Sequence, residues 1–102
     1  MSDTPIPDTP IPDTPVIDNA ESHRFELSEL GHIAFADYRR EGGRLVIPHV
    51  EAPMALRGGG AAGRLMEGIV VHARARGAKI VPLCSYAAAW LKRHPQYKDL
   101  VA

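Results

Sequence analysis

Prolines recur at short, regular intervals at the start of the chain. Residues 3–17 read DTPIP, DTPIP and DTPVI, a pentapeptide repeat with prolines at positions 5, 7, 10, 12 and 15. Proline lacks a backbone N–H and fixes φ, so this spacing excludes a helix and favours an extended polyproline-II chain. We therefore predict a disordered Pro/Asp-rich tail over residues 1–19 and one folded domain with a modest core over residues 20–102. The tail is interpreted as a solvated acidic leader, with recognition by a partner domain as the alternative.

Charge is distributed unevenly between the two parts. The chain has 12 basic and 12 acidic residues, but residues 1–19 hold four aspartates and no base (Asp3, Asp8, Asp13 and Asp18). The folded part is therefore moderately basic. Such an excess suits a small anionic ligand better than a nucleic-acid duplex, which requires a dense basic stripe. Nucleic acid is not an expected partner.

The single cysteine, Cys84, cannot form an internal disulfide. No basic-plus-apolar segment resembles a secretion signal, and no apolar run reaches the roughly 18 residues that a membrane span requires. We expect a cytoplasmic protein that makes no membrane contact.

Three segments alternate apolar and polar residues with a period of two, around Phe25–Leu27, Ile33–Tyr38 and Leu45–Val50. This period predicts three strands. Glycines in the intervening segments 29–31 and 41–43 permit the positive φ that tight hairpins need. The pattern therefore predicts an antiparallel meander.

The period lengthens to three and four after Pro53, which predicts an amphipathic helix over about 60–76 that ends at Gly77. The apolar positions are Ala62, Leu65, Met66, Ile69, Val70 and Ala73. A short strand over Lys79–Leu83 can then lie parallel to the third strand.

The end of the chain predicts a second helix. Pro82 has no N–H to donate, so it is expected at a sheet edge or at a splayed strand end. Ser85 is expected to cap a helix that runs to about Arg93. The fold class is α/β in the α+β sense, with the order β-β-β-α-β-α, a mostly antiparallel sheet and a splayed parallel strand pair.

A glycine-rich turn precedes the long helix. Backbone N–H groups at a helix start lack partners and the helix dipole is positive there, which favours phosphate binding. Residues without bulk let the backbone approach the phosphate oxygens, and an arginine adds charge. The predicted phosphate-binding residues are Arg57, Gly58, Gly59, Gly60, Ala61, Ala62 and Gly63.

Two other glycine-rich sites are excluded. A P-loop closes with Gly-Lys-Ser/Thr, but Gly63 is followed by Arg64, so the lysine and the magnesium-binding hydroxyl are missing. The segment from Gly58 to Gly63 satisfies Gly-x-Gly-x-x-Gly, but six residues (51–56) separate it from the preceding strand. The acidic residue that a dinucleotide site needs about 20 positions downstream is also absent.

A third kind of turn fits better. Arg57, Gly60 and Ala62 match Gln/Arg-x-x-Gly-x-Gly/Ala at the end of a meander and before an amphipathic helix. Three more segments accompany it: HVEAP at 49–53, PLCSY at 82–86 and RHPQY at 93–97. Together they resemble the small GNAT-like N-acetyltransferase domain family.

The resemblance covers residues 23–101 and implies a reduced acetyltransferase (GNAT-like) fold that uses acetyl-CoA as acyl donor. It implies that the pyrophosphate of the donor rests on residues 58–63 and that its pantetheine arm enters a split between the third strand and the strand ending at Cys84. Val50 departs from the threonine common in this family, and Gly59 replaces a residue that is often basic or polar.

Acyl transfer to an amine requires a base, stabilisation of the oxyanion and protonation of the departing thiolate. Glu51 or His49 could accept the amine proton, or be a solvated acid and a hydrogen-bonded strand residue. Tyr86 could protonate the thiolate, or serve in packing. Cys84 could act as an acid, a nucleophile or a neighbour of the thioester, or be a small buried apolar residue.

Two further candidates concern the end of the chain. His94 and Tyr97 match the terminal motif of the family, so His94 could contact the cofactor or brace the C-terminal segment. His49, Cys84 and His94 have no zinc-site spacing, so no metal is expected.

The resemblance implies an N-acetyltransferase in which an amine attacks the donor directly. The acceptor could be a protein or peptide lysine or a polyamine, because so small a domain leaves its acceptor side open. The alternative is a non-catalytic module that binds acetyl-CoA or CoA and contacts a partner protein.

Overall fold

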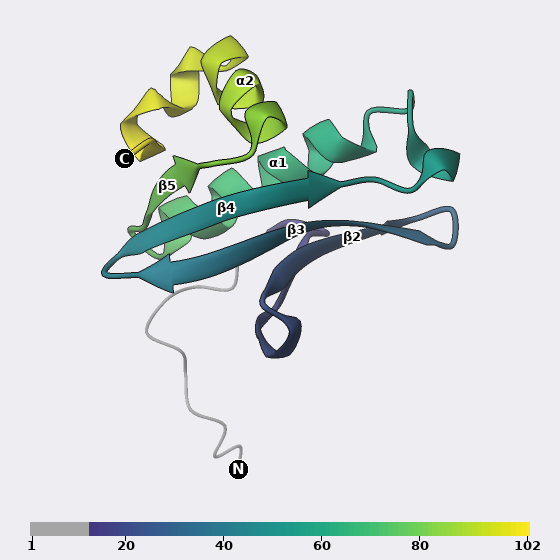
Figure 1. Ribbon diagram of the computed structural model, residues 1–102, viewed down its shortest axis with the longest axis horizontal. Coiled ribbons are helices and arrows are strands. Elements are labelled where there is room, and N and C mark those ends of the chain that lie inside the picture. The colour runs from purple at the N-terminus through teal and green to yellow at the C-terminus, as the bar shows by residue number, and fades with distance from the viewer. Residues whose placement is uncertain (1–12) are drawn as a thin grey trace.

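The computed structural model describes residues 13–102 (Figure 1). Residues 1–12, and the disorder expected for them, lie outside this range. One sheet of five strands, in the order β1-β2-β3-β4-β5, carries two α-helices.

The predicted meander is present. It comprises β2 (Arg24–Glu29), β3 (His32–Glu41) and β4 (Arg44–Glu51), paired antiparallel. Both connecting turns have positive φ at two successive residues, Leu30 and Gly31 in the first and Gly42 and Gly43 in the second. This geometry matches the right-handed twist of adjacent strands and explains the glycines.

The folded domain begins before residue 20, so the boundary expected from the prolines is wrong. Strand β1 (Ile17–Asn19) pairs antiparallel with β2, and Val16 is only 2% exposed. A glycine in the long helix explains this packing, because a Cβ on Gly68 would lie 2.1 Å from Val16 Cγ2. His72 Nε2 also donates to Val16 O at 2.9 Å.

The long helix α1 (Ala61–Ala75) lies within a residue of the predicted range, and Gly77 follows it with φ of 63°. Strand β5 (Lys79–Pro82) then pairs parallel with β4 as the last strand of the sheet. Pro82 is its final residue, so the missing N–H falls where strand pairing ends.

The second helix, α2, spans Ser85–Arg93, but Ser85 is not its cap. Cys84 occupies the N-cap position in an extended conformation and makes no side-chain capping bond. Short 3-10 helices complete the chain: η1 (Ala20–Ser22), η2 (Met54–Leu56) and η3 (Pro95–Leu100). No helix within residues 13–102 is long and apolar enough to cross a membrane.

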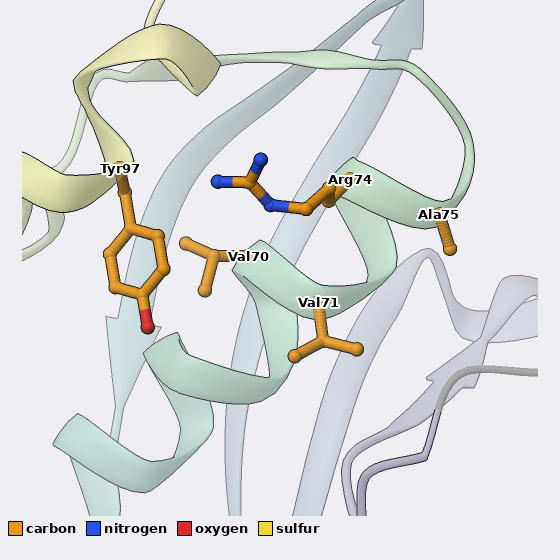
Figure 2. Close-up of a pocket in the computed structure, with 5 residues that line it drawn as sticks. All are labelled: Val70, Val71, Arg74, Ala75 and Tyr97. Atoms are coloured by element: carbon orange, nitrogen blue, oxygen red, sulfur yellow. The ribbon is translucent and has the colours of Figure 1, made fainter.

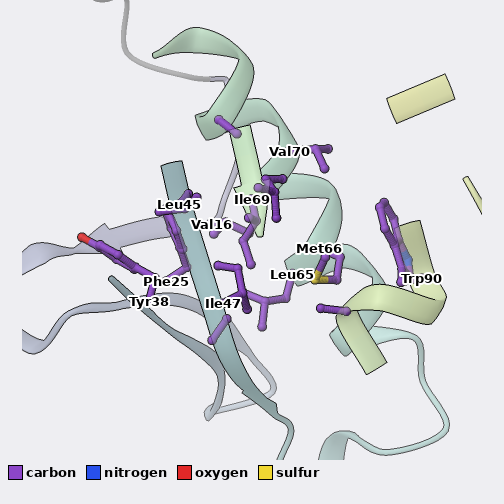
Figure 3. Packing of buried hydrophobic residues seen from close by; sticks show 14 of the residues in the cluster. Val16, Phe25, Tyr38, Leu45, Ile47, Leu65, Met66, Ile69, Val70 and Trp90 are labelled. Carbon is purple, nitrogen blue, oxygen red and sulfur yellow. The ribbon is translucent and has the colours of Figure 1, made fainter. Parts of the chain in front are cut away.

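One apolar cluster joins the sheet to both helices. In Figure 3, Leu45 and Ile47 of β4 point toward α1, where Leu65 and Ile69 meet them; all four are buried. Trp90 of α2 belongs to the same cluster. Both helices therefore cover one face of the sheet, which leaves the other face without a helix among the described residues.

Candidate functional site

The glycine-rich turn forms the predicted helix entrance. Gly58 and Gly60 both have φ of 82°, which favours glycine, and Gly60 is the N-cap of α1. No side chain caps this end. The N–H groups of residues 61–63 have no partner within the helix, because the first intrahelical bond runs from Arg64 N to Gly60 O at 3.0 Å. The turn therefore presents free donors at the positive end of α1.

A cavity of about 250 Å³ opens over this turn. Besides the turn, its lining includes Ala52, the residue after β4, and Tyr86 in the first turn of α2. The hydroxyl of Tyr86 lies 3.9 Å from the position of a Cβ built on Gly63, and Trp90 Nε1 lies 3.5 Å from it. Both are ordinary van der Waals distances, so α1 and α2 pack together at the cavity with space for a methyl group at Gly63.

Arg57 spans the turn and the sheet. Its Nε donates to Ala52 O at 3.1 Å, and its side chain is exposed at the cavity. A fixed positive charge therefore stands between the end of β4 and the start of α1.

A β-bulge orients the end of β4. Between two register pairs, Asp37↔His49 and Arg39↔Val46, β4 contains one residue more than β3. The extra residue reverses the alternation of the strand, so His49 shares a face with Val46 instead of Ile47. Pro48, which cannot donate to a ladder, lies within the bulge.

The splayed strand pair starts at the same place. The backbone N–H groups of Leu83 and Cys84 both donate to Ile47 O, each at 3.0 Å. Beyond Ile47, β4 continues to Glu51 without a β5 partner. Cys84 stands on the other side of this split, partly buried against the core.

His49 and Glu51 form a pair on the face away from the helices. His49 Nε2 donates to Glu51 Oε1 at 2.9 Å, and each side chain is 51% exposed. Val50, between them, packs against the core. The two candidate bases are therefore accessible at the end of the split, on the side opposite the cavity.

Tyr86 remains a hydroxyl at neutral pH. Burial raises the pKa of Tyr86, the nearby charge of Arg93 lowers it, and Cys84 raises it, so that the net shift is upward. A phenol with a raised pKa keeps its proton and can donate it.

His94 is not among the residues that line the cavity over the turn. It lies at the far end of α2, where its Nδ1 donates to Trp90 O at 2.7 Å and its ring stacks on the Trp90 ring at 3.9 Å between centroids. The ring of Tyr97 also stacks with that of Trp90, at 5.7 Å between centroids. These contacts match the bracing interpretation of the terminal motif, and contact of His94 with the cofactor stays a prediction.

A second cavity, of about 270 Å³, lies between α1 and η3, and Tyr97 is the one candidate residue in its lining. Figure 2 shows the ring of Tyr97 beside Val70, with Val71 and Arg74 farther along α1. Arg74 pairs with Asp99 at 3.3 Å. Among residues 13–102, no three His, Cys, Asp or Glu side chains gather into a metal-binding group.

Sequence reasoning missed two features of the site. Arg64 binds Glu29 of β2 at 2.6 and 2.7 Å, and its Nη1 lies 3.0 Å from a Cβ built on Gly60. Nothing in the local pattern indicates this pair, which joins segments 35 residues apart. The bulge did leave a signal, because Pro48 interrupts an apolar run.

Comparisons with known proteins support this geometry. The solution NMR structure of a GCN5-like candidate N-acetyltransferase from Staphylococcus aureus matches with a TM-score of 0.59 and 26% identity. The match covers 78% of this chain and 81% of that one. No curated protein matches the chain. A family model described as GCN5-related N-acetyl-transferase matches residues 24–100. Since this match covers most of the chain, the protein belongs to the GCN5-related N-acetyl-transferase family.

Proposed function

We propose that this protein transfers an acetyl group from acetyl-CoA to an amine. The observation that carries the proposal is the uncapped start of α1, which lies under a cavity beside the split between β4 and β5. Family membership supports the reaction class. The proposal assigns the pyrophosphate to the turn and the pantetheine arm to the split.

The residues present fit such a donor. Gly58 has φ of 82°, and no atom lies within 4 Å of the position that a Cβ would take there, so the backbone is open to an approaching phosphate. The free N–H groups of 61–63 supply hydrogen bonds to its oxygens, and Arg57 adds charge. When bound, acetyl-CoA would supply an activated acetyl thioester.

Protein groups on the two sides of the split take the proton-transfer roles. Glu51, assisted by His49, removes a proton from the acceptor ammonium, and the nitrogen lone pair freed in this way forms the new C–N bond. Tyr86 donates a proton to the sulfur as the C–S bond breaks. We assign Cys84 to the wall of the split, because its side chain packs against the core and direct attack needs no enzyme nucleophile.

Isothermal titration with acetyl-CoA and CoA tests the site. Gly58→Glu places an acidic side chain in the cavity and should abolish binding. Gly43→Glu is a matched control, because Gly43 has the same φ of 82° and the same open surroundings in a distant hairpin. Loss of binding in both variants, or in neither, would sink the assignment of the turn.

Turnover separates the two candidate functions. Release of CoA thiol is followed with a set of primary amines, and the acetylated product is identified by mass spectrometry. Acetylation would support the transferase. Binding of acetyl-CoA without acetylation of any amine would instead favour a non-catalytic module that presents the donor or CoA to a partner protein.

A further inference from the structure

We propose that the outer face of the sheet binds the acceptor as an aliphatic primary ammonium ion, with Asp37 as the specificity-determining residue. The outer face is the surface away from α1 and α2 formed by Glu26, Phe35, Asp37, His49 and Glu51. The inference rests on the proposed acetyl transfer, and it adds the site and the residue that select the acceptor.

Strand register assembles this surface. Phe35 of β3 lies between Glu26 of β2 and Glu51 of β4 in one cross-strand row. In the next row, Asp37 lies between Arg24 and His49. Directly opposed residues on one face have Cβ atoms about 5 Å apart, so the two rows form one continuous patch.

The bulge of β4 is what completes the patch. Without the extra residue between Val46 and His49, the side chains of His49 and Glu51 would point to the helix face with Ile47. With it, they face outward beside the split, where the acetyl group of the donor is assigned. An amine bound on the patch is therefore next to the thioester carbonyl carbon that it must attack.

Charge favours a cation on this patch. Within the patch, three carboxylates accompany one arginine, Arg24, which already gives its Nε to Glu26 at 2.6 Å. Arg39, the next residue of β3 on this face, is paired with Glu41 at 2.8 Å. Glu51 is bonded to His49, and Asp37 has no ion pair with any residue of the range 13–102. The carboxylate of Asp37 is thus available to an incoming ammonium group.

An aromatic ring supports the same occupant. Phe35 is partly exposed, its centroid lies 6.2 Å from that of His49, and the guanidinium of Arg24 already lies 4.7 Å from its centroid. A ring that holds one cation near its face, with carboxylates on both sides, suits an alkylammonium with an apolar stem. A neutral or anionic acceptor gains neither contact.

Amide-resolved NMR titrations test this inference without turnover. Three probes are used: spermidine, the peptide acetyl-Gly-Lys-Gly-amide and the same peptide with acetyllysine. We expect the first or second to shift the amides of residues 35, 37, 49 and 51, and the neutral third to leave them unchanged. The tighter of the two cationic probes identifies a polyamine or a lysine side chain as the source of the ammonium.

Variants separate a specific site from general attraction. Asp37→Asn should weaken binding of the cationic probe about tenfold, since a charge-assisted contact is lost, and Asp37→Glu should restore most of it. Glu41→Gln, on the same face at the far end of β3 and paired with Arg39, is the matched control and should change nothing. In the turnover assay, Asp37→Asn should raise KM for the amine and leave kcat unchanged.

Three results would overturn the inference: no shift with either cation, shifts outside the patch, or equal weakening by Asp37→Asn and Glu41→Gln. Acetyl-CoA titration of the same variants keeps the two proposals apart. If acetyl-CoA binds normally but amines do not bind to the patch, the proposed acceptor site is wrong and the proposed donor site is kept. If amines bind to the patch but acetyl-CoA does not bind, the proposed donor site is wrong and the acceptor site is kept.

Discussion

Asp18 in β1 accepts a hydrogen bond of 2.7 Å from Arg76 at the end of α1. Its carboxylate also accepts from Arg40 at 2.9 Å and from the hydroxyl of Tyr38, both in β3. The Asp18 side chain is only 11% exposed. One carboxylate therefore fastens the first strand to the long helix and to the middle of the sheet.

Replacement of Asp18 should loosen this end of the domain. Asp18→Asn keeps the shape but removes the charge that two arginines share, and we expect the free energy of unfolding to fall by about 2 kcal/mol. Urea denaturation followed by the fluorescence of Trp90 measures the change. Glu41→Gln, which breaks an exposed pair with Arg39, should cost less than about 0.5 kcal/mol. Equal effects would contradict the clamp.

The same carboxylate makes stability depend on pH. Burial raises the pKa of Asp18, but hydrogen bonds from Tyr38 and Arg76 and the charges of Arg40 and Arg76 outweigh it, so the net pKa lies below 3.8. A carboxyl whose pKa is lower in the folded state than in the unfolded state stabilises the fold at pH values above its unfolded-state pKa. This stabilisation is lost as the pH falls through the folded-state pKa. The stability gap between wild type and Asp18→Asn should therefore be full at pH 6 and shrink below about pH 4. A gap that is constant from pH 6 to pH 3 would refute this.

Substitution by alanine should change the stability of the fold in opposite directions at two glycines of α1. Glycine normally weakens a helix by about 1 kcal/mol relative to alanine. A Cβ on Gly63 would meet Trp90 Nε1 at an ordinary 3.5 Å, so Gly63→Ala should stabilise the fold. A Cβ on Gly68 would meet Val16 at 2.1 Å, so Gly68→Ala should destabilise it by displacing the N-terminal segment. Thermal unfolding of both variants tests the pair.

Local patterns predicted most of the fold. The hairpins and α1 follow from periods and glycines that lie within each element, and the structure places them within a few residues of the expected ranges. Strand β1 was not predicted, because it is only three residues long. Its neighbour Val16 is buried in the space that the missing side chain of Gly68 leaves, and Gly68 is far away in the sequence. Long-range packing of this kind leaves no periodic trace.

The candidate site divides in the same way. The turn at 57–63 could be located because small residues and a helix start stand together in the sequence. The contact of Tyr86 with the turn depends on how α2 packs on α1, which no local rule supplies. The terminal motif left two roles open for His94, cofactor contact and bracing. Its spacing of four from Trp90 is that of neighbours on one helix face, which agrees with the stacking of the two rings.

The two residues at the start of α2 should differ in their effect on catalysis. Tyr86→Phe removes a hydroxyl at the cavity and should lower kcat roughly 10- to 100-fold, because the thiolate loses its proton donor. Cys84→Ala should leave kcat within about threefold, since direct attack uses no enzyme nucleophile. Steady-state kinetics with saturating donor decide between them. An inactive Cys84→Ala variant that still binds acetyl-CoA would instead support a mechanism in which Cys84 is acetylated as an intermediate.

Glu51 offers the sharpest test of proton transfer. Glu51→Gln keeps the side-chain shape and an oxygen that can accept from His49 Nε2, so the strand and the pair geometry are preserved. It removes the capacity to take up a proton, and kcat should fall on the order of 100-fold while the Kd of acetyl-CoA stays unchanged. His49→Gln should have a smaller effect if His49 only orients Glu51. A larger effect for His49→Gln than for Glu51→Gln would reverse the assignment and make the imidazole the base.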